Sequence, residues 1–155
     1  IVDKYRWIDI GSSYLPSELN AAFLYAQFES SYKVQEKRQS LWNEYSEQLS
    51  KLDQLDLQII PNELEHNSHM FYIKLKNTDE RQKMIEHLKA FRIQSVFHYI
   101  PLHKSKKCSK YNIFHNKDEY TTIESERLLR LPIYYNLTVP DVKYICNKVQ
   151  EFFNG

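Results

Sequence analysis

The stretch Asp9-Ile-Gly-Ser-Ser-Tyr-Leu-Pro-Ser-Glu-Leu-Asn-Ala-Ala-Phe-Leu-Tyr-Ala-Gln-Phe-Glu29 joins a polar loop directly to a helical pattern. Pro16 suits a first helical position, because a backbone N–H at that position makes no hydrogen bond within the helix, and proline has none. From Ser17 to Leu52 the chain contains no glycine or proline, and apolar residues recur at helical spacing. This pattern predicts one long helix, or two helices with a break near Ser30. Such a length exceeds the needs of a small domain, so we expect part of the helix to pack on something absent from this chain.

Shorter extended segments follow and alternate with further helical signals. Asn77 to Glu80 supplies the hydrogen-bonding side chains typical of a helix start, and Val139-Pro140-Asp141 opens a last helical pattern. Strands are predicted at 57–60, 70–75 and 93–100 and near Leu131, with a short helix at 125–129 before the last of them. The sum is an α+β fold, with about four mostly antiparallel strands and helices packed on one face of the sheet.

The composition indicates one ordinary globular domain spanning residues 1–155. A formal net charge of +1 argues against a general nucleic-acid binder, which usually carries a strongly basic face. The two cysteines, Cys108 and Cys146, lack the spacing of a disulfide framework, which favours a reducing compartment such as the cytoplasm. No apolar run approaches the ~20 residues that span a bilayer, so the sequence predicts no membrane role.

A second segment, Val96-Phe-His-Tyr-Ile-Pro-Leu-His-Lys-Ser105, gathers two histidines, a tyrosine and a lysine around the end of a predicted strand. Side chains at a strand end can point into a cleft, although a core tyrosine with surface histidines explains the same pattern. The lysines at 104, 106, 107 and 110 form either a basic site for a diphosphate or a solvated loop. The spacing of His98, His103, Cys108 and His115 matches no usual structural-zinc pattern, so no metal site is predicted.

Three segments carry a resemblance to a known family, namely Trp7 to Glu18, His98 to Ser105 and Ser125 to Thr138. The chain resembles, over nearly its whole length, the DegT/StrS type of sugar aminotransferase. These are fold-type I enzymes that use pyridoxal 5'-phosphate (PLP) to put an amino group on a nucleotide-linked keto-sugar. The likeness is to the carboxy-terminal part only, so it implies that residues 1–16 are a loop leading from a larger amino-terminal domain that is missing here.

Within the family, the same segments look most like the branch that acts on TDP-4-keto-6-deoxy-D-glucose. That likeness implies transfer of an amino group from L-glutamate to the C4 ketone, giving TDP-4-amino-4,6-dideoxygalactose for a cell-surface polysaccharide such as enterobacterial common antigen or O-antigen. The lysine that carries PLP belongs to the family's larger domain. The resemblance therefore implies no catalytic residue in this chain, no activity of the chain by itself, and a homodimeric, cytoplasmic enzyme.

The resemblance also implies a place for the cofactor phosphate. Relatives carry an Asn-Tyr-Arg sequence ahead of the first helix, whose asparagine reaches the PLP phosphate of the neighbouring subunit. Aligning the chain on Ser17 puts Ser13, Tyr14 and Leu15 at those three positions, so the family's asparagine and arginine are both missing. The hypothesis that follows is that Ser12, Ser13 and Tyr14 contact the PLP phosphate instead.

Substrate contacts are implied by the second segment, which borders the substrate entrance in relatives. The residues expected to contact the sugar or its diphosphate are His98, Tyr99, His103 and Lys104. Arg127 and Arg130 are weaker candidates, and surface ion pairs explain them equally well.

Three alternatives stay open. The chain is either a part of this transaminase or a freestanding α+β module that binds a small regulatory ligand. A further alternative is a structural dimerisation domain, in which the long helix serves only to pair two chains. Finally, a PLP-dependent dehydratase of the same family keeps this domain and replaces the lysine by histidine.

Overall fold

The computed structural model describes residues 14–106, 110, 118 and 120–155. The chain divides into two compact units, residues 1–33 and 34–155. In the first unit, helix α1 (Glu18–Glu29) begins after Ser17, whose hydroxyl accepts a hydrogen bond from the N–H of Asn20 at 3.3 Å. Ser17 is thus the cap, and the prediction that Pro16 takes the first helical position is wrong, because Pro16 lies ahead of that cap. No residue of α1 is buried, although the helix carries several large apolar side chains.

Helix α2 (Ser31–Leu49) follows directly, and the backbone between the two helices turns at Ser30. The predicted break near Ser30 is therefore confirmed. From Val34 onward α2 belongs to the second unit. Four of its residues in that unit are buried, at the spacing expected for one face of a helix: Leu41, Trp42, Tyr45 and Leu49.

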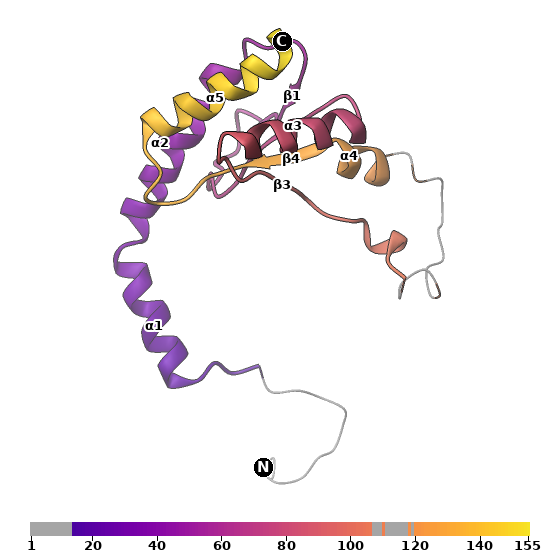
Figure 1. Cartoon of the computed structure of the whole chain (residues 1–155). Coiled ribbons are helices and arrows are strands. Elements are labelled where there is room, and N and C mark those ends of the chain that lie inside the picture. Colours follow the sequence, from indigo (N-terminus) through magenta and orange to yellow (C-terminus); the bar gives the residue numbers. More distant parts are fainter. Residues whose placement is uncertain (1–13, 107–109, 111–117, 119) are drawn as a thin grey trace. The chain divides into compact units, whose positions relative to one another are not determined.

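The second unit is built around a four-stranded sheet in the order β1-β2-β4-β3, in which every neighbouring pair is antiparallel (Figure 1). The predicted α+β fold with about four antiparallel strands is confirmed. The remaining elements, in chain order, are β1 (Asp56–Leu57), β2 (Phe71–Lys74), α3 (Thr78–Ala90), β3 (Val96–Phe97), the 3-10 helix η1 (Leu102–Lys104), α4 (Thr121–Arg127), β4 (Leu128–Leu131) and α5 (Val139–Asn154).

One face of the sheet, the covered face, holds the strand residues that are buried. In the register of β2 with β4, Phe71 lies opposite Leu131 and Ile73 lies opposite Leu129. All four are at most 4% exposed. Because side chains alternate along a strand, the residues between them point to the opposite face. This open face carries the half-buried residues Tyr72, Lys74, Leu128 and Arg130.

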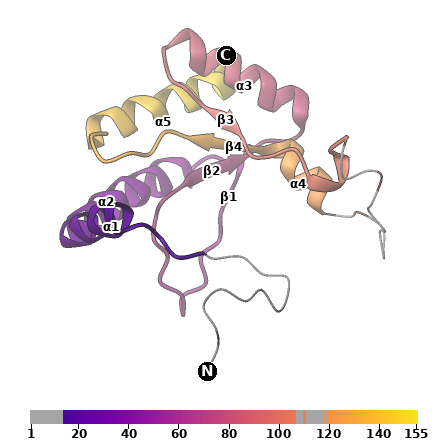
Figure 2. The same cartoon turned by 90° about the horizontal axis from the view of Figure 1, so that it is seen from below.

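Helices α2, α3 and α5 supply the other half of this core (Figure 2). The ring of Tyr45 on α2 stacks on Phe71 with centroids 4.8 Å apart, and its buried hydroxyl donates to the carbonyl of Pro132 at 2.8 Å. On the neighbouring helices, His87 Nε2 of α3 lies 2.8 Å from the carbonyl oxygen of Lys148 on α5. These contacts fix the segment after β4, which carries part of the site described below.

The helix starts follow the predicted chemistry. Asn77 caps α3 by accepting a hydrogen bond from the N–H of Glu80 at 2.9 Å. Thr138 and Asp141 form a reciprocal capping box at the start of α5, with Pro140 in the first turn.

Three element boundaries differ from the sequence prediction. Strand β3 covers only residues 96–97 instead of 93–100, β1 covers 56–57 instead of 57–60, and the short helix covers 121–127 instead of 125–129. A strand exists only where a neighbour pairs with it, and β4 offers β3 partners at two residues only.

Candidate functional site

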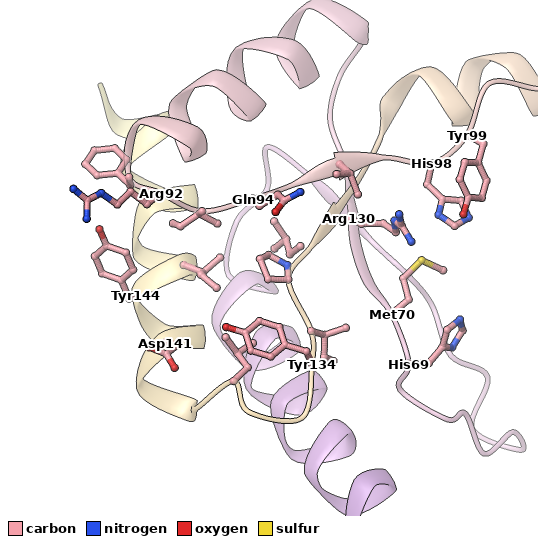
Figure 3. A pocket seen from close by; sticks show the side chains of 18 residues that line it. His69, Met70, Arg92, Gln94, His98, Tyr99, Arg130, Tyr134, Asp141 and Tyr144 are labelled. Carbon is pink, nitrogen blue, oxygen red and sulfur yellow. The ribbon is translucent and has the colours of Figure 1, made fainter. Parts of the chain in front are cut away.

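A groove with a volume of about 840 Å³ runs along the end of β4 toward the start of α5 (Figure 3). At one end lie side chains from three strand ends: His69 and Met70 before β2, His98 and Tyr99 after β3, and Arg130 from β4. At the other end lie Arg92, Gln94, Tyr134, Asp141 and Tyr144. In the register of β3 with β4, Val96 lies opposite Arg130. His98 follows two residues later and lies close enough to Arg130 for the guanidinium charge to act on it.

The first end is a cluster of two aromatic rings and a guanidinium. The rings of His98 and Tyr99 have centroids 3.9 Å apart, and the Cζ of Arg130 lies 5.8 Å from the centroid of Tyr99. His98 Nδ1 and Arg130 Nε are both buried, and neither has a hydrogen-bond partner in the part of the chain that the structure describes. Buried polar atoms are normally paired, so these two mark a place that another molecule or another part of the protein completes.

The electrostatics of the cluster favour a neutral histidine beside a fixed positive charge. Burial of the imidazole lowers the pKa of His98, and the positive charges of Arg130 and His69 lower it further. A neutral imidazole at pH 7 leaves the guanidinium as the charged group of this end. No acidic side chain among the described residues pairs with Arg130 within ion-pair distance.

The second end of the groove is more exposed. Tyr134 and Tyr144 are 54% and 46% exposed. Asp141 is engaged in the α5 capping box, where its carboxylate accepts hydrogen bonds from Thr138, and these bonds lower its pKa. This end therefore offers aromatic surface rather than a reactive carboxylate.

His103 and Lys104, on η1, are held by acidic partners instead of lining the groove. His103 Nε2 lies 2.9 Å from Asp118 Oδ2 and 3.1 Å from the hydroxyl of Thr122. Lys104 Nζ donates to Glu126 Oε1 at 2.8 Å. Both pairs tie η1 to the region of α4.

The cofactor residues expected from the sequence are only partly visible. Ser12 and Ser13 lie outside the described residues, whereas Tyr14 is described and is 90% exposed. Among the described residues, no three His, Cys, Asp or Glu side chains gather in a way that could hold a metal ion. Within the same residues, no helix combines the length and the apolar character needed to cross a membrane.

A model of the DegT/DnrJ/EryC1/StrS aminotransferase family matches residues 2–150 of the chain. The chain belongs to this aminotransferase family. A relative from Methanocaldococcus jannaschii, the uncharacterized protein MJ1066, is 28% identical to this chain over 153 residues, which is 95% of this chain and 39% of the relative.

Solved structures show the same fold. DesV from S. venezuelae has a TM-score of 0.82 at 22% identity, and the match covers 97% of this chain and 40% of DesV. PseC from Helicobacter pylori, an aminotransferase involved in pseudoaminic acid biosynthesis, has a TM-score of 0.81 at 16% identity, and the match covers 99% of this chain and 42% of PseC. This chain thus spans about two fifths of the length of the relatives it matches.

One residue of the groove, Arg130, is a weaker candidate by sequence, because a surface ion pair explains it equally well, yet it lines the groove beside His98. His69, an exposed loop residue before β2, lines the same end. For Arg130 a signal was present, since it alternates with the apolar residues Leu129 and Leu131 in a strand and therefore faces away from the core. No sequence pattern indicated that this face would meet the end of β3.

Proposed function

We propose that this chain is the carboxy-terminal domain of a PLP-dependent nucleotide-sugar aminotransferase. The reaction is transfer of the amino group of L-glutamate to the C4 ketone of TDP-4-keto-6-deoxy-D-glucose, which yields an amino sugar for a cell-surface polysaccharide. The enzyme works in the cytoplasm as a homodimer. Family membership supports the aminotransferase class, and the likeness of segments 7–18, 98–105 and 125–138 to one branch supports the sugar.

The observation that carries this function is the groove that gathers His98, Tyr99 and Arg130. A keto-sugar linked to a diphosphate offers hydroxyl groups and anionic oxygens, and these three side chains offer a hydrogen-bonding imidazole, a phenol and a guanidinium. The volume of about 840 Å³ lies within the usual range of small-ligand sites. His103 and Lys104 do not line the groove and are paired with Asp118 and Glu126, and on this proposal they contact the part of the diphosphate that extends beyond the groove.

The residues of the groove fit a role toward the substrate rather than toward attachment of the cofactor. No lysine lines the groove among the described residues. On this proposal the lysine that attaches PLP lies in the part of the family's length that this chain does not span, and Ser12, Ser13 and Tyr14 contact the PLP phosphate of the neighbouring subunit. PLP, when bound, carries the amino group from donor to acceptor. The part of this chain is to bind and orient the sugar and to exclude water from it.

The experiment uses the full reading frame that contains this chain, purified with PLP and incubated with ¹⁵N-labelled L-glutamate and TDP-4-keto-6-deoxy-D-glucose. We expect the label to appear in a TDP-amino-sugar, detected by mass spectrometry, and NMR of the product assigns the position and stereochemistry. Label transfer to another keto-sugar nucleotide, but not to TDP-4-keto-6-deoxy-D-glucose, would support a sugar aminotransferase and overturn the proposed substrate. No label transfer to any keto-sugar nucleotide would overturn the function.

Two controls accompany the assay. The 155-residue chain purified by itself is expected to be inactive under the same conditions, because it lacks the PLP lysine. Light scattering of the full-length protein is expected to give the mass of a dimer. A product that has lost a hydroxyl without gaining nitrogen would instead support the dehydratase alternative.

A further inference from the structure

Arg130 is a charged side chain whose surroundings inside the chain do not account for its position. Its guanidinium Nε is buried without a hydrogen-bond partner among the described residues. The contact that orients it is the face of Tyr99, at 5.8 Å. A cation over an aromatic ring at a partly exposed site is stabilised only weakly. That stabilisation is smaller than the cost of a buried donor without an acceptor.

The neighbours of Arg130 make the same place a site for a negative charge. His98 contributes a second buried nitrogen without a partner, and His69 lines the same end of the groove. Figure 3 shows the guanidinium of Arg130 directed toward His98 and Tyr99 at the end of the groove. Nothing acidic among the described residues that line this end neutralises the guanidinium. A ligand with anionic oxygens would supply the acceptor that Arg130 Nε lacks and, in the tautomer that carries the proton on Nδ1, an acceptor for His98 as well.

We propose that Arg130, assisted by His98, binds an anionic group of a substrate, either a carboxylate of the amino donor or the diphosphate of the sugar nucleotide. This inference rests on the proposed function and names the residue that recognises the charge. A guanidinium suits either source, because its planar fork donates two parallel hydrogen bonds to a carboxylate or a phosphate. Arg130 is thus a binding residue that determines which substrates the groove accepts.

The test compares wild-type full-length enzyme with Arg130→Gln and Arg130→Lys. Initial rates give KM separately for L-glutamate and for the sugar nucleotide. We expect Arg130→Gln to raise one of the two KM values about 10- to 100-fold, which corresponds to the roughly 1.5–3 kcal/mol of a hydrogen bond to a charged group. Arg130→Lys keeps the charge without the fork and is expected to recover only part of the loss.

Lys83→Gln is the matched control, because it also removes one positive charge but lies on α3 in an exposed pair with Asp79. Its KM values are expected to equal those of wild type. A rise in KM for glutamate alone assigns the carboxylate, and a rise for the sugar nucleotide alone assigns the diphosphate. Unchanged KM values for both substrates in a normally folded Arg130→Gln enzyme would overturn the inference.

A binding measurement separates this inference from the proposed function. Inorganic pyrophosphate and acetate are titrated calorimetrically into full-length wild type and into Arg130→Gln. Binding of either anion to wild type, weakened at least tenfold in the variant, supports the anion site even in a protein without transaminase activity. Equal binding to both proteins, or binding to neither, would overturn the anion site while leaving the proposed function to its own assay.

Discussion

Arg127 and Arg130 stand three residues apart, yet their surroundings are opposite. Arg127 closes α4 and has partners on three sides: its Nε donates to the carbonyl of Leu75 at 2.7 Å, and its terminal nitrogens meet Asp56 at 2.6 Å and Glu124 at 3.2 Å. Arg130 lies on the open face of β4 beside the groove, without an acidic partner among the described residues.

The difference shows that two neighbouring arginines, one at the end of α4 and one on β4, can have a structural role and a binding role respectively. Around Arg127, the hydrogen bonds link α4 to β1 and β2, so the charge is satisfied inside the fold. Around Arg130, the fold positions a cation and leaves its acceptors to be supplied from outside. Binding sites commonly reduce stability in this way, because polar groups that already have hydrogen-bond partners within the protein are not available to a ligand.

The largest effect is expected from one of the two leucines between these arginines. Leu129 is fully buried on the covered face, whereas its neighbour Leu128 is half-buried on the open face. Leu129→Ala is expected to lower the free energy of unfolding by about 2–5 kcal/mol, because it leaves a cavity under α2, α3 and α5. Leu128→Ala is the control and is expected to cost less than half as much. Urea titration of the chain, followed by tryptophan fluorescence, measures both, and equal losses would contradict the assignment of the faces.

The second prediction compares the two arginines directly. Replacement by methionine keeps most of the aliphatic stem and removes the charge. Arg127→Met is expected to lower the free energy of unfolding by about 2 kcal/mol, chiefly through the lost hydrogen bond to the carbonyl of Leu75, a buried residue. Arg130→Met is expected to leave the free energy of unfolding unchanged or to raise it, because it removes a buried donor that has no acceptor among the described residues. The same urea titration provides the measurement, and a larger loss at Arg130 would show that its role is structural.

Much of the fold could be predicted because local chemistry determines it. The absence of glycine and proline from Ser17 to Leu52, the cap at Asn77 and the proline in the first turn of α5 each act within a few residues. The strands were placed less well. Val96 and Phe97 form β3 because β4 pairs with them, and that pairing joins residues more than thirty positions apart.

The candidate site could be predicted only in part for the same reason. The family resemblance indicated His98 and Tyr99, which line the groove. It indicated His103 and Lys104 as well, but their partners Asp118 and Glu126 come from a segment whose approach no local pattern reveals. Arg130 was undervalued because its importance depends on the register that sets it opposite Val96.

The smallest effect concerns the acid stability of the paired region. The hydrogen bond from Lys74 lowers the pKa of Glu124 below its ordinary value of 4.5, and Arg127 lowers it further. The unfolded chain therefore binds the proton more readily than the folded chain. Glu124 stabilises the fold fully above pH 4.5, and this stabilisation is lost as the pH falls through the lowered pKa.

Glu124→Gln removes this dependence while keeping the shape of the side chain. At pH 7 the variant is expected to unfold at a slightly lower urea concentration than wild type, since the side chain is partly exposed and the ion pairs are screened. Between pH 5 and pH 3, in steps that bracket the ordinary glutamate pKa of 4.5, the two urea midpoints are expected to converge. Asp118 and Asp141, whose pKa values are also lowered, remain in both proteins and cancel in the comparison. A gap that stays constant with pH would mean that the network around Arg127 holds Glu124 by geometry rather than by charge, and the contrast with Arg130 would then rest on hydrogen bonds alone.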